Sequence, residues 1–401
     1  MTLPNCMPSL RNKRLILGLS GGIAAYKAAE LCRLLVKDGA EVKVVMTPGA
    51  QSFITPLTMQ ALSGQRVHTD LLDVEAEAAM GHIELARWAD LIVVAPASAS
   101  FIARLAKGEA SDLLSTLCLA RRGPLAIAPA MNQAMWHNAA TQANLQTLRE
   151  RGVAIWGPDS GAQACGDVGL GRMLEPAALL ALAQSSFESG LLAGKKVTLT
   201  AGPTREALDP VRYLSNHSSG KMGYALAEAA AEAGADVTLV TGPTALEAPE
   251  RVKTIRVESA EDMLQACQAN PADIFIGVAA VADYRPAAPA AHKIKKSQDT
   301  LTLTLVRNPD ILATMAASNP KPFCVGFAAE TQDLARYARG KLEAKGLDLV
   351  FANDASATFG NDEAEVLALW RDGETLLERA SKTQLAREMI RLISSRLAQR
   401  P

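Results

Sequence analysis

Short apolar runs of strand length alternate with helical segments along the first 160 residues. The runs lie at 13–19, 41–46, 91–95, 125–128 and 153–156, and a helical pattern over 23–38 follows the first of them. Strands that alternate with helices are typical of βαβ units, in which the strands form a parallel sheet. The alternation therefore predicts a parallel α/β sheet for the first half of the chain.

The same pattern starts again near residue 195. A strand is expected at 195–200, a helix at 222–233 and a strand within 234–241, followed by strands at 274–278, 301–306, 323–327 and 347–351. A hairpin at 366–377 and an amphipathic helix at 381–397 end the chain. We predict two Rossmann-like, doubly wound parallel-sheet α/β domains in tandem, 1–190 and 191–401, joined by a Ser- and Gly-rich linker at 185–194.

Charge and cysteine spacing exclude several classes of protein. Lys and Arg number 41 and Asp and Glu number 42, so the chain lacks the basic excess of a nucleic-acid-binding domain. The six cysteines form no Cys-x-x-Cys pair, which excludes a zinc ribbon or a thioredoxin-like motif. The apolar run at 15–19 is too short for a signal peptide, and no other run reaches membrane-spanning length. We expect a cytoplasmic protein with reduced thiols and with no nucleic-acid or membrane partner.

Three segments have the composition of anion-binding loops. The Gly-Leu-Ser-Gly-Gly-Ile loop at 18–23 lies between a strand and a helix, with Ser20 where a dinucleotide site has its second glycine. This favours a mononucleotide phosphate bonded by Ser20, although a βα turn without ligand explains the loop equally well. The loop at 216–223 fails the P-loop pattern at Ser215 and Met222 but still gathers donors at a helix start. The Lys-Ile-Lys-Lys segment at 293–296 is either a polyphosphate clamp or a solvated face.

Three single residues are candidates for catalysis in the first half. His82 follows a glycine and is either a base in a loop or a structural histidine. Asn132 follows a buried strand, so we expect it at the carboxyl edge of the sheet, where open α/β folds bind ligands. Cys165 lies in a glycine-rich, lid-type loop at 159–171 and should be exposed, whereas Cys32 and Cys118 lie on helical patterns and should be packing residues.

Together these motifs closely resemble those of the bifunctional phosphopantothenoylcysteine decarboxylase/phosphopantothenate–cysteine ligase family of bacterial coenzyme A biosynthesis. The first half is similar to the flavin-dependent cysteine decarboxylases in its segments 18–27, 81–84, 95–97 and 129–132 and in the loop around Cys165. The second half is similar to the ligase in its segments 201–206, 209–212, 215–223, 279–284, 293–296, 308–310 and 325–330. The order of these motifs matches the family over nearly the whole chain.

The resemblance implies a ligase that joins 4'-phosphopantothenate to L-cysteine with CTP through an acyl-cytidylate. It implies that Asn216 is required for turnover of this intermediate, and that Mg²⁺ enters with CTP through ligands that the sequence does not reveal. The CTP contacts that it implies are Asp283, Lys293, Asn308, Pro309, Asp310, Ile311, Phe327, Lys341 and Lys345. Lys341 and Lys345 are also four residues apart on a helical pattern and should share a face, either at the site or as a surface stripe.

The resemblance also implies an FMN-dependent decarboxylase that converts phosphopantothenoylcysteine to 4'-phosphopantetheine. In this half, His82 would be the base, Asn132 would hold the substrate carboxylate, and Cys165 would supply a proton. The expected FMN contacts are Ser20, Gly21, Gly22, Thr47, Ser98 and Ser115. Family decarboxylases bury flavin between subunits and the ligase domains dimerise, so a large homo-oligomer is implied.

Two other functions remain open at this point. A flavoprotein oxidoreductase with a fused nucleotide-binding domain would need an electron partner, and no Gly-x-Gly-x-x-Gly offers a nicotinamide site. A flavin-binding regulatory subunit should lack the active-site His, Asn or Cys, whereas this chain has His82, Asn132 and Cys165.

Overall fold

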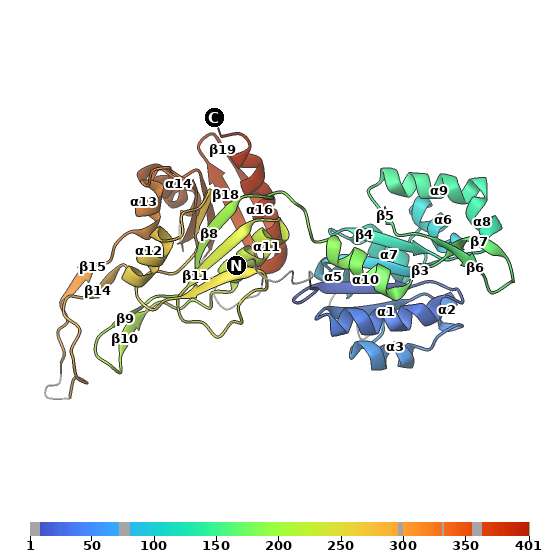
Figure 1. The fold of residues 1–401 in the computed structure, drawn as a ribbon, viewed down its shortest axis with the longest axis horizontal. Coiled ribbons are helices and arrows are strands. Elements are labelled where there is room, and N and C mark those ends of the chain that lie inside the picture. Colours follow the sequence, from blue (N-terminus) through green and yellow to red (C-terminus); the bar gives the residue numbers. More distant parts are fainter. Residues whose placement is uncertain (1–8, 72–80, 296–299, 331–332, 355–362, 401) are drawn as a thin grey trace. The chain divides into compact units, whose positions relative to one another are not determined.

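The computed structural model describes residues 9–71, 81–295, 300–330, 333–354 and 363–400 (Figure 1). The chain divides into two compact units, Met7–Phe187 and Glu188–Pro401, and each is described by itself. None of the helices among the described residues is long and apolar enough to cross a bilayer.

The first unit contains a five-stranded parallel sheet. Its strands are β1 (Arg14–Leu19), β2 (Glu41–Met46), β3 (Leu91–Ala97), β4 (Leu125–Pro129) and β5 (Ala154–Ile155). They lie in the order β2-β1-β3-β4-β5. The order reverses at β1, whose Gly18 pairs with Val45 of β2 on one side and with Val94 of β3 on the other. A reversal of this kind opens a crevice at the carboxyl ends of the two central strands.

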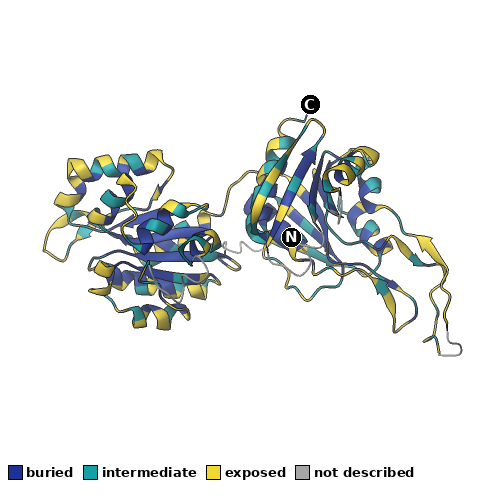
Figure 2. Ribbon diagram, turned by 180° about the vertical axis from the view of Figure 1, so that it is seen from behind, coloured by how far each residue is buried: buried dark blue, intermediate teal, exposed yellow. Residues whose placement is uncertain are grey.

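Helices cover both faces of this sheet, and Figure 2 shows the buried strands between them. One layer contains α1 (Ala25–Lys37), α3 (Pro56–Ser63) and α10 (Pro176–Ser185), and the other contains α5 (Gly81–Trp88), α6 (Ala99–Lys107), α7 (Leu113–Ala120) and α9 (Ala139–Glu150). The short helices α2 (Pro48–Gln51) and α8 (Gln133–His137) follow β2 and β4. A two-stranded hairpin, β6 (Asp159–Ala162) and β7 (Val168–Arg172), stands apart from the main sheet and is called the hairpin below.

The second unit is built on an eight-stranded sheet. In spatial order the strands are β12 (Val252–Arg256), β11 (Asp236–Thr241), β8 (Lys196–Ala201), β13 (Ile274–Gly277), β16 (Phe323–Glu330), β17 (Leu349–Asp354), β18 (Glu363–Trp370) and β19 (Gly373–Ser381). The first six are parallel, and β18 and β19 add an antiparallel edge. The six parallel strands have the Rossmann order, which reverses between β8 and β13.

Helices again lie on both faces of the sheet. The helices α11 (Lys221–Glu232) and α16 (Lys382–Leu397) form one layer, and α12 (Ala260–Gln268), α13 (Ile311–Ala316) and α14 (Leu334–Ala344) form the other. The first turn of α11 approaches β8 so closely that a Cβ at Gly223 would lie 2.5 Å from the Cβ of Ala201. Two small ribbons lie outside the sheet: β9 (Arg205–Ala207) with β10 (Tyr213–Ser215), and β14 (Tyr284–Pro286) with β15 (Leu305–Arg307).

These two tandem α/β sheets confirm the predicted fold class. The strand expected at 301–306 is wrong for most of its length, because only Leu305–Arg307 is a strand and it pairs with β14 instead of with the sheet. Leu301, Leu303 and Leu305 are all exposed, so this segment packs no apolar face against the sheet.

Candidate functional site

The polar residues predicted for the first unit gather where its parallel strands end. Ser20 follows β1, Thr47 follows β2, Ser98 follows β3, and Asn132 lies three residues beyond β4. Parallel strands end at one edge of a sheet, so the prediction that Asn132 lies at the carboxyl edge is confirmed.

Ser20 joins the two central strands at the point where the strand order reverses. Its hydroxyl donates to the carbonyl of Pro96 at 2.8 Å and accepts from the backbone N–H of Ser98 at 2.8 Å. Its side chain is buried, with 1% of the residue exposed. A serine hydroxyl has one proton to donate, so the bond to a phosphate expected for Ser20 is replaced here by a bond within the scaffold.

The glycines beside Ser20 leave room for a ligand. A Cβ at Gly22 would have no heavy atom within 4 Å, so open space lies in front of the first turn of the 13-residue helix α1. Gly21 packs against Gly49, where a Cβ would lie 3.0 Å from backbone atoms. Open space at a helix start, bounded by backbone that no side chain covers, is suited to a phosphate group.

The hydroxyls of Thr47, Ser98 and Ser115 are all used in helix caps. Thr47 is the N-cap of α2 and accepts from the N–H of Ala50. Ser98 is the N-cap of α6 and accepts from the N–H of Phe101. Ser115 is fully buried, and its hydroxyl donates to Asp112 in the capping box of α7. Thr47 and Ser98 can still donate their protons to a ligand, whereas the Ser115 hydroxyl already donates to Asp112.

His82 is the second residue of helix α5, and the expectation of a loop there is wrong. The acidic segment 73–77, like Met80, lies outside the described residues. The Nδ1 atom of His82 is buried and has no hydrogen-bond partner among the residues that the structure describes. A buried polar atom without a partner is costly, so this nitrogen is suited to contact a ligand.

The hairpin brings Cys165 to Asn132. The side-chain N–H₂ of Asn132 donates to Asp167 at 2.8 Å, to the Cys165 sulfur at 3.2 Å and to Gln163 at 3.2 Å. The Asn132 oxygen accepts from the N–H of Ala134 and thereby caps α8. Hydrogen bonds from Asn132 and then from Cys165 lower the pKa of Asp167 and outweigh a small opposing effect of burial. The predictions that Cys165 is exposed and that Cys32 and Cys118 are buried are confirmed.

A buried lysine anchors the base of the hairpin. Lys27, in the first turns of α1, donates from Nζ to the carbonyl of Met173 at 2.9 Å and to Glu175 at 2.8 Å. Lys27 is buried, and Glu175 also accepts from Arg172, the last residue of β7. The helix that begins at the proposed phosphate position is thus bonded to the segment that leaves the hairpin.

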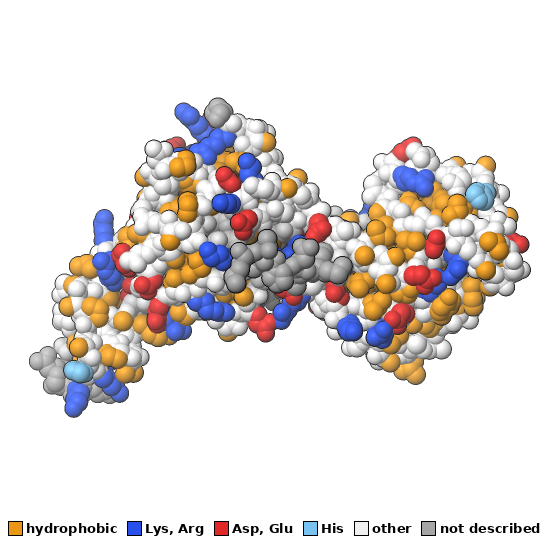
Figure 3. Space-filling view, viewed as in Figure 1, with side chains coloured by type: hydrophobic (Ala, Val, Ile, Leu, Met, Phe, Trp, Pro, Cys, Tyr) orange, Lys and Arg blue, Asp and Glu red, His pale blue; other side chains and the backbone are white. Residues whose placement is uncertain are grey.

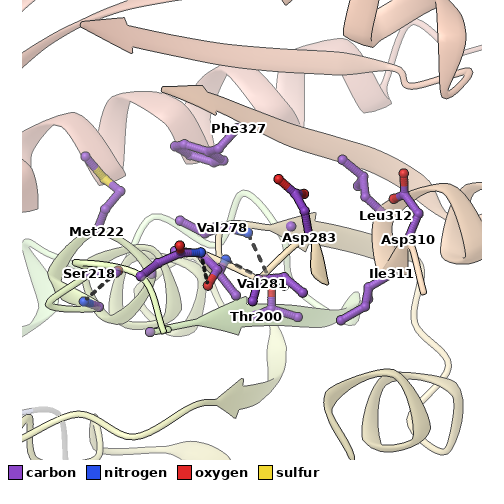
Figure 4. Close-up of a pocket in the computed structure, with 18 of the residues that line it drawn as sticks. Thr200, Ser218, Met222, Val278, Val281, Asp283, Asp310, Ile311, Leu312 and Phe327 are labelled. Carbon is purple, nitrogen blue, oxygen red and sulfur yellow. Dashed lines mark hydrogen bonds between the residues drawn. The ribbon is translucent and has the colours of Figure 1, made fainter. Parts of the chain in front are cut away.

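The second unit has a cavity of about 1000 Å³ at the reversal between β8 and β13. It lies between the loop that starts α11 and the segment after β13, and Figure 4 shows Ser218 and Met222 on one side and Asp310, Ile311 and Leu312 on the other. Nine of the predicted residues line it: Asn216, Asp283, Asn308, Pro309, Asp310, Ile311, Phe327, Lys341 and Lys345. The anion-binding loop expected at 216–223 lies at this cavity, with Gly220 as the cap of α11.

Threonine and asparagine side chains hold the segment that follows β13. The Thr200 hydroxyl accepts from the N–H groups of Val278 at 3.2 Å and Ala279 at 3.1 Å, as seen in Figure 4. The side-chain N–H₂ of Asn216 donates to the carbonyl of Ala280 at 3.1 Å. This bond fixes the side-chain amide of Asn216, including its oxygen, relative to the segment after β13. Asn308 donates to Ala282 at 2.7 Å and has a structural role beside the cavity.

Two cations and one carboxylate lie on the α13–α14 side of the cavity. Lys341 donates to the carbonyl of Phe327 at 2.5 Å, and Lys345 pairs with Asp310 at 2.6 Å. Burial alone would raise the pKa of Asp310, but the hydrogen bond from Lys345 and that from the Ala313 N–H outweigh it and lower this pKa. Lys341 lies in the last turn of α14 and Lys345 is its C-cap. Both line the cavity, which favours a place at the site over a surface stripe.

Lys293 is the exception among the predicted CTP contacts. It is exposed and is not among the residues that line the cavity, whereas Lys296 lies outside the described residues. The neighbouring Ile294 donates its N–H to Asp209, which also accepts two bonds from Arg212. The bonds from Arg212 are the largest cause that lowers the pKa of Asp209, so this carboxylate is a charged anchor for the 293–295 segment.

Several residues of these sites were not identified from the sequence. They include Lys27, Gln163, Asp167, Thr200 and Lys382, the last of which also lines the cavity. Asp167 and Gln163 lie within the lid-type loop that the sequence does indicate, but only the folded hairpin shows that they meet Asn132. No group of three His, Cys, Asp or Glu side chains with metal-ligand geometry occurs in the described part of the chain.

Comparisons with known proteins agree for both units. A family model described as "Flavoprotein" matches residues 7–188, and one described as "DNA/pantothenate metabolism flavoprotein C-terminal domain" matches residues 192–397. The coenzyme A biosynthesis bifunctional protein CoaBC of Vibrio cholerae is 57% identical over 98% of this chain and 100% of its own length. The protein of the same name from Escherichia coli is 52% identical over 97% and 98% of the two chains. A solved structure of a C-terminal domain of CoaBC is 42% identical, with a TM-score of 0.46, and covers 53% of this chain and all of its own.

Proposed function

The chain belongs to the CoaBC family of bifunctional coenzyme A biosynthesis proteins, and from this premise we propose how its residues divide the two reactions. Its activities are those of a phosphopantothenate–cysteine ligase and a phosphopantothenoylcysteine decarboxylase. The flavoprotein domain lies in the first unit and the ligase domain in the second. The oxidoreductase and regulatory-subunit alternatives have no support in relatives that match the full length.

We propose that FMN binds at the reversal between β1 and β3. The open space at Gly22 would take its phosphate at the start of α1, and the hydroxyls of Thr47 and Ser98 remain available as donors. Ser20 would position this loop through its bonds to Pro96 and Ser98. Ser115 remains a predicted contact, although its hydroxyl already donates to Asp112 in the cap of α7.

Three side chains would act on the substrate of the decarboxylase. Bound FMN would supply the two-electron redox chemistry by which the carbon that bears the substrate thiol is oxidised to a thioaldehyde before CO₂ leaves and is reduced again afterwards. His82 would accept the thiol proton, and Asn132 would hold the carboxylate with its amide N–H₂. Loss of CO₂ from the thioaldehyde leaves an ene-thiolate. The carbon that lost CO₂ would then take a proton from the Cys165 thiol. The Cys165 thiolate would then recover its proton from water.

The cavity of the second unit carries the proposal for the ligase. The substrate carboxylate would attack the α-phosphorus of CTP, and pyrophosphate would leave. The cysteine amine would then attack the acyl carbon and release CMP together with a proton. The start of α11 and the ammonium groups of Lys341 and Lys345 lie at one cavity, where they would bind phosphate groups. Asn216, held by Ala280, would orient the acyl-cytidylate.

Mg²⁺ would enter this cavity with the triphosphate. Mg²⁺ is usually bound by one or two carboxylates together with phosphate oxygens and water. Asp283 lines the cavity and fits this requirement, whereas Asp310 is already paired with Lys345. Lys293 remains a predicted CTP contact that the cavity lining does not support.

The homo-oligomer and the cytoplasmic location also belong to this proposal. Large hydrophobic side chains are exposed beside the proposed flavin site, at Ile23, Tyr26, Phe53 and Leu57. Figure 3 shows hydrophobic side chains gathered on one face of the first unit. Exposed apolar patches of this kind commonly mark interfaces between subunits.

One experiment on the purified full chain tests both halves. We expect a yellow protein with the absorbance of oxidised flavin, and release of pyrophosphate only when CTP and 4'-phosphopantothenate are both present. Addition of L-cysteine should give phosphopantothenoylcysteine and then CO₂. A colourless protein that does not take up FMN would refute the flavin site, and equal turnover with ATP would refute the CTP selectivity.

A further inference from the structure

The carboxylate of Asp167 accepts a hydrogen bond from Asn132, the residue that is proposed to hold the substrate carboxylate. Asn132 donates to Asp167 at 2.8 Å, the shortest of the three bonds from its amide to the hairpin. Asp167 is exposed, and the other residues of this cluster are the neutral side chains of Gln163 and Cys165. Asp167 is therefore the single carboxylate in direct contact with the Asn132 amide among the described residues.

The Asn132 amide has two N–H protons and already donates to three side chains of the hairpin, so a substrate carboxylate must displace at least one of them. Asp167 is the acceptor among them with the same charge as the substrate carboxylate, so repulsion between the two anions favours its displacement. The displacement would also move Cys165, because this residue is two positions away on the same turn and its sulfur accepts from the same Asn132 amide. When CO₂ has left, the N–H that held the substrate carboxylate is without that acceptor until Asp167 returns to it.

We propose that Asp167 is a positioning residue that exchanges with the substrate carboxylate on Asn132 and thereby times the approach of Cys165. This inference rests on the proposed roles of Asn132 and Cys165. While the carboxylate is present, Asp167 is off the amide and the thiol is held away from the substrate. After decarboxylation, Asp167 binds Asn132 again and brings Cys165 to the ene-thiolate carbon. That carbon then takes the thiol proton, and water restores the proton to Cys165.

The contacts at the base of the hairpin separate this role from simple support of the fold. The anchor from Lys27 to Met173 and Glu175 holds the base and does not involve Asp167. Within the hairpin, Gln163 accepts from the backbone N–H of Gln133 at 3.0 Å and so ties the turn to α8 without Asp167. Removal of the Asp167 charge should therefore leave the hairpin folded.

The test is a binding measurement with two ligands that cannot react. They are the S-methyl ethers of phosphopantothenoylcysteine and of 4'-phosphopantetheine, which differ by one carboxylate and lack the free thiol. Their Kd values are measured by calorimetry on the flavin-loaded full chain, with Asp167→Asn and Asp167→Ala as variants. Asp159→Asn is the matched control, because it removes an exposed charge at the base of the same hairpin.

We expect Asp167→Asn to bind the carboxylated ligand about fivefold more tightly and the ligand without carboxylate unchanged, because a neutral amide competes less well for Asn132. Asp167→Ala should show the same selectivity, and Asp159→Asn should change neither Kd. In turnover with the natural substrate, both Asp167 variants should lower KM and kcat together and release oxidised ene-thiol. A purely structural role would instead raise KM.

Other outcomes contradict the inference. Equal shifts for both ligands, or the same tightening in Asp159→Asn, would show an effect of general charge and would overturn the role of Asp167. If both ligands bind the wild type but the Asp167 variants show no selective change in Kd, the role of Asp167 is overturned and the proposed decarboxylase site still stands. If neither ligand binds the wild-type chain, the proposed decarboxylase site is wrong and the inference fails with it.

Discussion

Replacement of Lys27 by Met tests whether the base of the hairpin depends on one buried ammonium group. Methionine has a similar length and fills similar space, so the change removes the charge with little loss of packing. In the wild type, Nζ of Lys27 lies 2.9 Å from the carbonyl of Met173 and 2.8 Å from Glu175. Both partners belong to the segment that leaves the hairpin at Arg172.

The expected cost follows from the exposure of the two partners. Met173 is 1% exposed, so its carbonyl would be left without a partner in a buried position, at a cost of about 1–3 kcal/mol. The side chain of Glu175 is 58% exposed, so its ion pair contributes less than about 1 kcal/mol. The variant no longer has to bury an ammonium group, which offsets part of this loss. We expect a net loss of about 1–2 kcal/mol.

Hydrogen exchange in the full chain measures this loss where it occurs. A local destabilisation of about 1.4 kcal/mol corresponds to a tenfold faster exchange, so amides of the hairpin should exchange about fivefold to thirtyfold faster in Lys27→Met. Calorimetry should show a decrease in Tm of the first unit by about 2–8 °C. Lys37→Met, which removes an exposed charge from the same helix, is the control. Unchanged exchange in the hairpin relative to this control, or loss of ligase activity, would refute the reasoning.

Four further predictions concern single side chains. His82→Asn should abolish CO₂ release with ligation intact; CO₂ release at the normal rate would remove His82 from its role as the base. Cys165→Ser should release oxidised, decarboxylated ene-thiol, which mass spectrometry of the products detects, and normal phosphopantetheine output would contradict it. Asn216→Asp should accumulate acyl-cytidylate in rapid-quench experiments, whereas unimpaired ligase turnover would contradict the assignment. Asp209→Asn should lower the Tm of the second unit at neutral pH. Because the pKa of Asp209 is lowered in the folded chain, its contribution is present above the unfolded pKa of about 4 and is lost as pH falls further, so wild type and variant should converge in acid.

The fold could be predicted because apolar periodicity alone separates strands from helices in a doubly wound domain. Strand β2 was predicted with its observed bounds, and the helix expected at 222–233 is displaced by one residue from α11. The error at 301–306 has a physical origin, since alternation of Leu and Thr does not show which strand the segment pairs with. This segment pairs only with β14, whose short ribbon leaves the leucines exposed.

The sites could be predicted less completely, because a sequence shows residue types but not their hydrogen-bond partners. Asn216, Phe327 and the two lysines of α14 follow a motif and do line the cavity. Ser20 was also singled out, yet its hydroxyl proton is donated to a carbonyl 76 positions away. Asp167 was overlooked for the same reason, since its bond to Asn132 spans 35 positions and depends on the closed hairpin.

In both units a buried hydroxyl links the two central strands at the reversal of strand order. At a reversal of strand order the crossover helices leave toward opposite faces, so the ends of the two central strands lack a helix between them. A hydroxyl on or just after the first strand spans this gap in both units: Ser20 accepts from the N–H of Ser98, and Thr200 accepts from those of Val278 and Ala279. Both hydroxyls are buried. Because each bonds to backbone, it leaves the crevice lined by main chain and small side chains, which is the surface that a nucleotide phosphate requires. Ser20 therefore holds this loop by a different means from the second glycine of a dinucleotide site, and the mononucleotide expected here stays a prediction.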